Sequence, residues 1–344
     1  MKNIPINMLL SKILLSFFIT GLFSMCSPSA KVKAQSANNN NLPYFGFNAK
    51  GTLNADEQTN YTNDLLDQIT QTDIKKNLPI RVTGGTLSQT TYKNDWTLEI
   101  IHKWVALQKK QGIRFIYVVN GNDEPANQAA IIKEWLSAGA HFDFIEMMNE
   151  YYLPKFARGD KSFKEVTEQV SPEKYVDTIL PKFWKELDQF KLPYYLIFAP
   201  RRTDPKANEY LQHWNEVLSD AVIKKYPERN LNAVIHLYLK EETTVNRFDY
   251  DQIDAVRKQL PAGRYIAITE AGVINKELDY QAAADLTINH YRQILKHLIP
   301  GDYLLDQVLY NASKNNNTAL VSPEFSGETP KGKAMIKFIN GELK

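Results

Sequence analysis

Residues 142–150 read FDFIEMMNE, a mostly apolar stretch that ends in an amide and a carboxylate, Asn149 and Glu150. Continuous apolar runs of this length are typical of strands that are buried on both faces of a parallel sheet. Seven similar runs occur from residue 43 onward. They are PYFGFN (43–48), PIRVTGG (79–85), RFIYVVNG (114–121), PYYLIFAP (193–200), NAVIHLYL (232–239), RYIAITEAG (264–272) and DYLLDQVLYN (302–311).

Stretches with helical spacing separate these eight runs. One covers residues 95–112, with Gly112 as the expected C-terminal cap, and another covers residues 171–190, where Pro181 should kink the helix or mark a boundary. Strands and helices that alternate eight times favour an α/β fold, the (β/α)8 or TIM barrel, as a single domain over residues 42–344. A doubly wound open sheet is the alternative, but neither a G-x-G-x-x-G pattern nor a phosphate-binding loop follows the first strand.

The composition is that of a globular protein with nearly balanced charge. Of the 344 residues, 43% are hydrophobic, which is enough for a sizeable core. The chain has 41 Lys and Arg against 39 Asp and Glu, a formal net charge of +2. This balance argues against a nucleic acid as partner, because nucleic-acid-binding domains carry a strongly basic face.

Residues 1–34 are predicted to be an export signal. The apolar run ILLSFFITGLF, at residues 13–23, has the length of a signal-peptide core and is short for a membrane span. Cys26 follows in LFSMCS and resembles the lipidated cysteine of a bacterial lipoprotein, whereas ordinary cleavage after Ala34 is the alternative. We therefore expect an exported protein, either periplasmic, anchored to the outer membrane through Cys26, or secreted, with residues 35–41 as a polar tether. The chain has no second cysteine, so no disulfide is expected.

The seventh apolar run, RYIAITEAG, also carries a carboxylate near its end. Thr269 and Glu270 stand just before its last two residues. In (β/α)8 barrels the catalytic groups lie at the C-terminal ends of the strands. Glu150 and Glu270 are therefore expected to face each other across the barrel mouth. Two carboxyl groups about 5–5.5 Å apart can cleave a glycosidic bond with retention, one as acid and the other as nucleophile. The competing interpretation is that each carboxylate merely caps the following helix.

These residues resemble clan A, the large group of retaining (β/α)8-barrel glycoside hydrolases in which an Asn-Glu pair ends strand four and a Glu ends strand seven. The resemblance implies that Glu150 is the acid/base, that Asn149 hydrogen-bonds the sugar 2-hydroxyl and that Glu270 is the nucleophile. It also implies an oligo- or polysaccharide substrate with β-linked or equivalent α-L-arabino sugars, and no cofactor.

Five further residues are expected to contact the substrate or the nucleophile. Arg81, in RVTGG on the second strand, corresponds to the arginine of the clan that lies near the nucleophile. The sequence HLY on the sixth strand matches the His-x-Tyr of the clan and gives His236 and Tyr238. A tyrosine hydroxyl that donates to the nucleophile would keep that carboxylate ionised. Asn48, which ends the first strand, and Tyr151, whose ring is a stacking face for a sugar, complete the expected binding residues.

The sequence departs from the clan at three points. Strand eight commonly ends in a tryptophan that forms the floor of the sugar subsite, whereas this chain offers Tyr310 and Asn311. Tyr151 stands where a proline often follows the Asn-Glu pair. Val82 and Thr83 follow the arginine where an aromatic residue and a glycine are usual. The family within the clan, the sugar and the linkage are therefore left open.

Cationic residues after strands four, five and six point to an acidic glycan as one option, since arginine pairs bidentately with carboxylate or sulfate. The alternative is that these cations pair with acids such as Glu146, Glu241 and Glu242 or face water. Tyr44 and Tyr152 are further candidates for sugar stacking. The cationic residues are Lys155, Arg158, Arg201, Arg202 and Lys240.

Other types of site have little support in the sequence. There is no H-x-H, H-E-x-x-H or G-x-S-x-G pattern, so neither a metal site nor a serine hydrolase is expected. The histidines in helical stretches are expected to be surface or interhelical residues, and the tryptophans in such stretches to be core residues. Trp96, soon after the second strand, either stacks on a sugar or begins the next helix, and the structural role is favoured. A non-catalytic glycan-binding protein, in which the carboxylates only hydrogen-bond sugar, is the alternative function. The residues concerned are His102, His213, His290, His297, Trp104, Trp135, Trp184 and Trp214.

Overall fold

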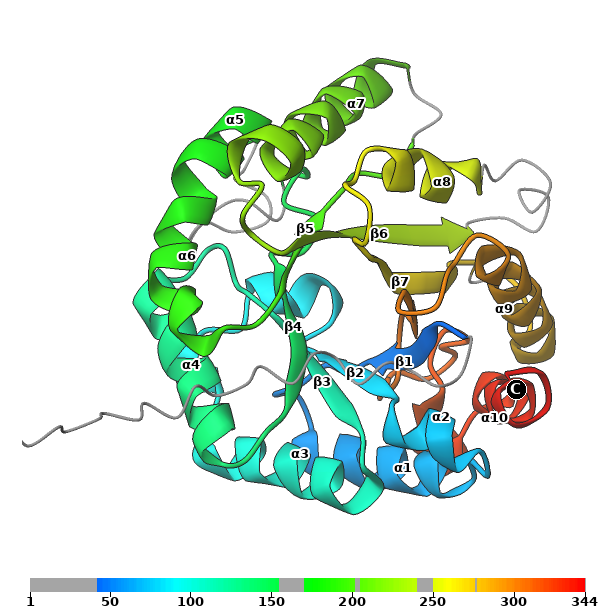
Figure 1. Cartoon of the computed structure of the whole chain (residues 1–344). Helices are drawn as coiled ribbons and strands as arrows, with labels where there is room; N and C mark the ends of the chain where they lie inside the picture. Colours follow the sequence, from blue (N-terminus) through cyan, green and yellow to red (C-terminus); the bar gives the residue numbers. More distant parts are fainter. Residues whose placement is uncertain (1–41, 155–169, 202–204, 240–249, 276, 344) are drawn as a thin grey trace, which may run out of the picture. The chain divides into compact units, whose positions relative to one another are not determined.

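The computed structural model describes residues 42–343, except 155–169, 202–204, 240–249 and 276. Within these residues eight parallel strands, paired in chain order, close into a barrel in which β1 pairs with β8 (Figure 1). The predicted (β/α)8 barrel is therefore confirmed, and each of the eight apolar runs contains one strand. The strands are β1 (Tyr44–Asn48), β2 (Pro79–Val82), β3 (Arg114–Val118), β4 (Phe142–Met147), β5 (Tyr194–Ile197), β6 (Leu231–Leu239), β7 (Ile266–Val273) and β8 (Tyr303–Asp306).

Helices surround the barrel and cover the outer face of the strands (Figure 1). The chain then ends in α10, which follows a short hairpin of β9 (Val321–Ser322) and β10 (Gly327–Glu328). The predicted leader, residues 1–34 with Cys26, lies outside the described residues. None of the described helices is both long enough and apolar enough to cross a membrane. The helices are α1 (Ala55–Asp67), α2 (Thr72–Lys76), α3 (Leu98–Gln111), α4 (Pro125–Ser137), α5 (Pro172–Lys174), α6 (Leu180–Leu187), α7 (Pro205–Asp220), α8 (Asp251–Lys258), α9 (Tyr280–Leu295) and α10 (Pro330–Glu342).

The helix ends follow the sequence signals. The side chain of Thr97 accepts a hydrogen bond from the amide of Ile100 at the start of α3, and Gly112 ends this helix with φ 73°. Pro181 is the second residue of α6, and a π-helical turn over Tyr175–Ile179 joins this helix to α5 without a break. The expected boundary at Pro181 is therefore wrong, because the chain stays helical through it. The wider turn just before Pro181 changes the hydrogen-bond pattern where the proline lacks an N–H.

Aromatic side chains fill the space between the helices and the barrel. Trp96 meets the ring of Trp135 edge to face, with ring centroids 5.2 Å apart, so its structural interpretation is confirmed. Four further tryptophans, all in helices, are fully buried, as the sequence predicted. Those four tryptophans are Trp104, Trp135, Trp184 and Trp214.

The histidines outside the strands lie on the surface or between helices, as expected. His290 is buried, and its two ring nitrogens lie 2.8 Å from the hydroxyl of Tyr250 and 3.0 Å from the carbonyl oxygen of Leu237. His297 lies 2.8 Å from the Asp254 carboxylate.

The chain has two other Asn-Glu pairs, at residues 208–209 and 215–216. Both lie in α7 and not at the end of a strand.

An ion pair lies at the N-terminal end of the barrel. Arg114, the first residue of β3, pairs with the buried Asp143, the second residue of β4. The hydroxyl of Tyr303 donates to Asp143 at 3.3 Å, and the ring of Tyr44 stacks on that of Tyr303 at 4.7 Å. Burial raises the pKa of Asp143 to about 6, although the positive charge of Arg114 acts in the opposite direction. Tyr44 thus begins its strand at the end of the barrel opposite Glu150. Its expected role as a sugar-stacking face is wrong.

Candidate active site

The C-terminal end of β4 carries both members of the Asn-Glu pair. Asn149 and Glu150 follow the strand in a tight turn in which Met148 has φ 71° and Glu150 has φ 42°. Both values lie in the left-handed region, which costs a residue with a side chain about 1–3 kcal/mol. Such a backbone conformation persists where the surrounding contacts hold a side chain in one fixed position. Here it turns Asn149 and Glu150 toward the barrel axis, where both are buried and only 9% of Glu150 is exposed.

Glu270, on β7, is held by three donors. Arg81 donates to its Oε1 at 2.5 Å, the backbone amide of Gly85 donates to the same oxygen at 3.0 Å, and the hydroxyl of Tyr238 donates to Oε2. Burial alone would raise the pKa of Glu270, but the charges of His236 and Arg81, with the hydrogen bonds from Tyr238 and Arg81, hold it below its ordinary value. Glu270 is therefore a carboxylate at neutral pH.

Arg81 is fully buried and binds four side chains. Its guanidinium forms a bidentate pair with Glu146, at 2.8 and 2.6 Å, and donates to Asn149 at 2.7 Å as well as to Glu270. Burial would raise the pKa of Glu146, yet the charge of Arg81 and the neighbouring His236 lower it. One guanidinium thus connects β2, β4 and β7 and pairs with two carboxylates.

His236, on β6, lies between the two predicted catalytic carboxylates. Its Nδ1 is 3.3 Å from an oxygen of Glu150 and 3.9 Å from an oxygen of Glu270. Its Nε2 lies 3.1 Å from the hydroxyl of Thr269. Burial would lower the pKa of His236, but the carboxylate of Glu270 and the neighbouring carboxylates of Glu146 and Glu150 raise it to about 9. The imidazole is thus a buried cation at neutral pH, next to both acids.

The structure brings together six of the eight residues that the sequence assigned to the site, and it adds three. The three additions are Glu146, the backbone amide of Gly85 and the hydroxyl of Tyr152, which donates to Glu150 at 3.3 Å. Tyr152 was expected to stack on a sugar, but its ring is fully buried. Glu146 was expected among the acids that pair with rim cations, whereas it lies beneath the site on Arg81. Burying an acidic residue in a mostly apolar strand is unfavourable unless it is paired. The position of Glu146 inside such a strand was therefore the sequence feature that could have predicted a buried ion pair. The six are Arg81, Asn149, Glu150, His236, Tyr238 and Glu270.

Asn48 makes three hydrogen bonds inside the barrel. Its amide nitrogen donates to the carbonyl oxygens of Thr269 and of Asp306, the latter at 2.8 Å, and its amide oxygen accepts from Arg81 at 2.8 Å. Asn48 thus holds the ends of β1, β7 and β8 together and orients Arg81. Its assignment to the sugar is replaced by this positioning role, because both amide donors and the acceptor oxygen already have protein partners.

Tyr151 packs away from the carboxylates. Only 5% of it is exposed, its ring lies on that of Tyr175 with centroids 5.8 Å apart, and its hydroxyl donates to the carbonyl of Gly121 at 3.1 Å. The described contacts of Tyr151 are those of a packing residue. Its assignment to sugar stacking stays a prediction.

A buried ionic network lies behind β7 and β8. The carboxylate of Asp306 accepts from Lys331 of α10 at 2.6 Å and from the hydroxyl of Tyr291 of α9 at 2.6 Å. The same hydroxyl lies 2.9 Å from the carbonyl of Ala271, directly after Glu270. The network fixes the strand end that carries Glu270 against the last two helices.

The position after β8 differs from the tryptophan floor of clan A. The hydroxyl of Tyr310 donates to Glu57 and lies 3.2 Å from the amide of Asn54, and its ring stacks near Tyr61. Tyr310 therefore faces α1. Of the expected rim cations Arg201 is described and exposed, and the others lie outside the described residues: Lys155, Arg158, Arg202 and Lys240.

The barrel is similar to the solved structures of two glycoside hydrolases and of a bacterial virulence factor. A GH5 cellulase from an Icelandic hot spring isolate aligns with a TM-score of 0.54 at 16% identity, over 88% of this chain and 89% of that chain. A family 39 glycoside hydrolase from Bacteroides cellulosilyticus WH2 gives 0.52 at 11% identity, over 87% of this chain and 64% of that chain, so this chain spans less than two thirds of that protein. The virulence factor SghA from Agrobacterium tumefaciens gives 0.50 at 13% identity, over 83% and 87%.

No protein-family model and no curated protein sequence matches the chain. At the identities of the structural neighbours, the likeness establishes the fold. It is the (β/α)8 barrel that glycoside hydrolases use, and the chemistry has to be argued from the residues of this chain.

Proposed function

We propose that the protein is a retaining glycoside hydrolase of the clan A type, with Glu270 as nucleophile and Glu150 as acid/base. The observation that carries the proposal is the convergence of two strand-end carboxylates on one imidazole nitrogen. Since these oxygens lie 3.3 and 3.9 Å from Nδ1 of His236, they are no more than about 7 Å apart, which accommodates the roughly 5–5.5 Å of retaining enzymes. A separation beyond about 10 Å would have counted against catalysis.

In the first step Glu150 gives its proton to the glycosidic oxygen while a carboxylate oxygen of Glu270 attacks the anomeric carbon. The bond from that carbon to the leaving oxygen breaks with its electron pair, and a covalent glycosyl ester forms on Glu270. The lowered pKa of Glu270 keeps it ionised for the attack and makes it a good leaving group later. Arg81, Gly85 and Tyr238 hold the carboxylate in place.

In the second step water attacks the anomeric carbon, Glu150 accepts a proton from it, and the ester bond to Glu270 breaks. Glu150 is negatively charged between the two steps. The cationic imidazole of His236, 3.3 Å away, stabilises this charge. His236 therefore contributes most while Glu150 is ionised.

Asn149 is oriented for a sugar hydroxyl. Its amide oxygen accepts from Arg81 at 2.7 Å, so the carbonyl side of the amide is turned toward the barrel interior. The amide nitrogen is then the group that can donate to the substrate, and we assign it to the 2-hydroxyl. The substrates are β-linked glycans or their α-L-arabino equivalents.

Export is part of the proposal. The leader at residues 1–34 would carry the enzyme out of the cytoplasm, and lipidation of Cys26 would anchor it to a membrane. The mass of the mature N-terminus tests this. A diacylglyceryl-modified Cys26 supports anchoring, and a chain that begins at Gln35 supports ordinary cleavage.

A glycan-binding protein without catalytic activity is the second candidate. The observation that favours it is the absence of a tryptophan after β8, since Tyr310, which follows that strand, contacts α1 instead. In that case Glu150 and Glu270 would only accept hydrogen bonds from sugar hydroxyls.

The deciding experiment is sugar release from a panel of neutral, uronic and sulfated β-linked glycans, with the wild-type protein and with Glu270→Ala. We expect hydrolysis by the wild type, loss of at least about 10³-fold in the variant, and partial recovery with azide, which replaces the missing carboxylate as nucleophile. Glu228→Ala, which removes an exposed carboxylate just before the N-terminal end of β6, is the matched control. Binding of a panel member without any turnover would establish the glycan-binding alternative.

A further inference from the structure

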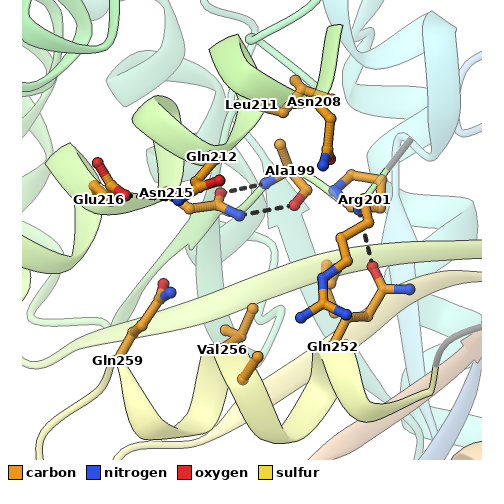
Figure 2. Close-up of a pocket in the computed structure, with 13 residues that line it drawn as sticks. Ala199, Arg201, Asn208, Leu211, Gln212, Asn215, Glu216, Gln252, Val256 and Gln259 are labelled. Atoms are coloured by element: carbon orange, nitrogen blue, oxygen red, sulfur yellow. Dashed lines mark hydrogen bonds between the residues drawn. The ribbon is translucent and has the colours of Figure 1, made fainter. Parts of the chain in front are cut away.

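A cavity of about 250 Å³ lies between α7 and α8, outside the barrel, and Figure 2 shows polar side chains from both helices around it. Two of these side chains bind protein backbone. Asn215 forms two hydrogen bonds with Ala199, at 2.7 and 2.9 Å, and Gln252 accepts from the N–H of Arg201 at 3.1 Å. These uncharged amides hold the end of β5. A carboxylate that stays ionised in the interior points to function more strongly.

Glu146 is such a carboxylate. It lies on β4, four residues before Glu150, and its side chain is fully buried. Burial would raise its pKa, but the charge of Arg81 and the neighbouring His236 hold that pKa below its ordinary value, so Glu146 is ionised at neutral pH. A fully buried side chain cannot touch a substrate. Any effect of Glu146 on the reaction therefore acts through the groups that it contacts.

Glu146 contacts both cations of the site. It accepts two hydrogen bonds from Arg81, at 2.8 and 2.6 Å, and its Oε1 lies 3.9 Å from Nε2 of His236. The other ring nitrogen, Nδ1, lies 3.3 Å from Glu150 and 3.9 Å from Glu270. The imidazole thus has one carboxylate beside Nε2 and two beside Nδ1. The charged and titratable groups around it in the described part of the chain are Arg81 of β2, Glu146 of β4, Glu150 after β4, Glu270 of β7 and Tyr238 of β6 itself.

The charges of this cluster balance before and after the covalent step. In the resting enzyme Glu150 is protonated, so the anions Glu146 and Glu270 offset the two cations. When Glu270 attacks, it becomes an uncharged ester, the proton of Glu150 leaves with the glycosidic oxygen, and Glu150 becomes the second anion. The sum is again zero. Without Glu146 one cation would be in excess in both states, and an unbalanced buried charge is unfavourable.

The excess would fall on His236, because an imidazole can lose its proton whereas a guanidinium in a protein does not. Burial lowers the pKa of His236, and among the influences that raise it, to about 9, the carboxylate of Glu270 is the largest. The charge of Glu270 disappears in the ester. Glu146 has no reacting atom, so its charge is constant. It supports the imidazolium in the half of the reaction in which Glu270 cannot.

We propose that Glu146 is a positioning residue whose fixed negative charge keeps the proton on His236 while the negative charge of the site moves from Glu270 to Glu150. This inference rests on the proposed function. The alternative is that Glu146 contributes to stability alone, as the partner of Arg81. Only in the first case does the charge of the imidazole depend on Glu146.

The first test is the NMR titration of the His236 ring protons in the purified protein, with His236→Asn for assignment. Glu146→Gln removes the charge and keeps the shape, so the titration midpoint of His236 should fall by about 1–3 pH units. Glu146→Asp keeps the charge and should lower the midpoint less. Asp143→Asn removes another buried, arginine-paired acid, three residues earlier on the same strand. It is the matched control and should leave the midpoint unchanged.

The second readout is the pH profile of kcat/KM. The active form carries a proton on both Glu150 and His236, and the first of these protons is held less tightly when a nearby anion is removed. The alkaline limb of Glu146→Gln should therefore move to lower pH by about one pH unit or more, and its deficit relative to the wild type should shrink toward acidic pH. A purely structural role gives an equal loss at every pH.

A third measurement needs no variant. The wild-type enzyme, trapped as its glycosyl ester with a 2-deoxy-2-fluoro glycoside, should keep His236 protonated at pH 7 although Glu270 is then uncharged. If Glu146→Gln does not fold, this measurement decides.

The proposal is overturned if His236 has the same midpoint in folded Glu146→Gln as in the wild type, or if the trapped ester contains a neutral imidazole. The titration of the free protein requires no turnover. A lowered midpoint without hydrolysis of any glycan would establish the link between Glu146 and His236 and reject the enzyme. Hydrolysis with an unchanged midpoint would do the reverse.

Discussion

The two ends of this barrel each contain an arginine paired with a buried acid, and the two pairs behave in opposite ways. At the N-terminal end Arg114 meets a single carboxyl group, Asp143, among aromatic rings. Burial prevails there and raises the pKa of Asp143 to about 6. At the C-terminal end Arg81 meets Glu146 and Glu270, and the pKa of Glu270 is lowered.

The difference lies in the donors around each carboxylate. Glu270 accepts from Arg81, the Gly85 amide and Tyr238, with the cationic His236 nearby. For Asp143 the charge of Arg114 and the hydroxyl of Tyr303 are the opposing influences, and they do not outweigh desolvation. A buried ion pair is therefore no sign of a site. A carboxylate that stays ionised despite burial, beside further acids, is one.

The largest expected effect separates the two arginines. Arg81→Met leaves two buried carboxylates without their cation, so kcat/KM should fall at least about 10³-fold and the free energy of unfolding by about 3–5 kcal/mol. Arg114→Met should leave kcat/KM within about twofold and cost less stability, because Asp143 can take up a proton. Steady-state kinetics and urea unfolding of both variants measure this. Equal losses of activity would break the comparison.

The tyrosine pair gives the next largest effect. Tyr238→Phe removes a hydrogen bond to the ionised Glu270, worth about 1.5–3 kcal/mol, so kcat/KM should fall about 10- to 100-fold. The pKa of Glu270 should also rise, and the acidic limb of the kcat/KM profile should move to higher pH. Tyr303→Phe, which removes the donor to Asp143, should leave that limb in place. An unmoved limb in Tyr238→Phe would show that the hydroxyl does not act on Glu270.

Asp143 should make the protein less stable as the pH rises. Its folded pKa, about 6, is above its ordinary value of 3.8. The folded state therefore binds the proton more tightly, and the free energy of unfolding should fall between about pH 4 and pH 6, by on the order of 1–3 kcal/mol. Asp143→Asn should lack this fall in urea unfolding at a series of pH values. Parallel curves for the wild type and the variant would show that Arg114 offsets burial.

The smallest effect concerns the rim of the catalytic end. Tyr151→Phe removes the hydrogen bond to Gly121, so the free energy of unfolding should fall by about 1 kcal/mol while kcat/KM changes less than about twofold. Activity assays and thermal unfolding of this variant decide whether the hydroxyl serves packing or contacts the sugar, and Tyr151→Leu, which removes the ring, tests stacking in the same assays. A fall in kcat/KM of more than about tenfold at unchanged stability would return Tyr151 to the sugar.

The sequence was sufficient for the strands and for the strand-end carboxylates, because apolar runs and their polar ends are local features. Glu150 and Glu270 could be placed for this reason. Tyr44 was wrongly assigned to the sugar. It begins its strand, and the first residue of a barrel strand lies at the end of the barrel opposite Glu150. Chain order alone was enough to correct it.

The partners of Arg81 could not be predicted from the sequence. Arg81 on β2 reaches Glu146 on β4 across an intervening strand, and Gly85 contributes a backbone amide that no side-chain pattern reveals. Asn48 likewise offered an amide at a strand end, and only the closed barrel shows that Thr269, Asp306 and Arg81 occupy it. Contacts across the barrel axis depend on closure and side-chain direction, which sequence spacing does not contain.

The pairing of β1 with β8 has a consequence for the synthesis of this protein. Tyr44 meets Tyr303, so one edge of the first strand has no partner until almost the whole chain has left the ribosome. Lys331, which completes the ionic network behind Glu270, is made later still. Long-range parallel pairing of this kind folds slowly and exposes strand edges meanwhile. A nascent chain that stalls before β8 therefore has an open barrel, and chaperones that cover strand edges should bind it.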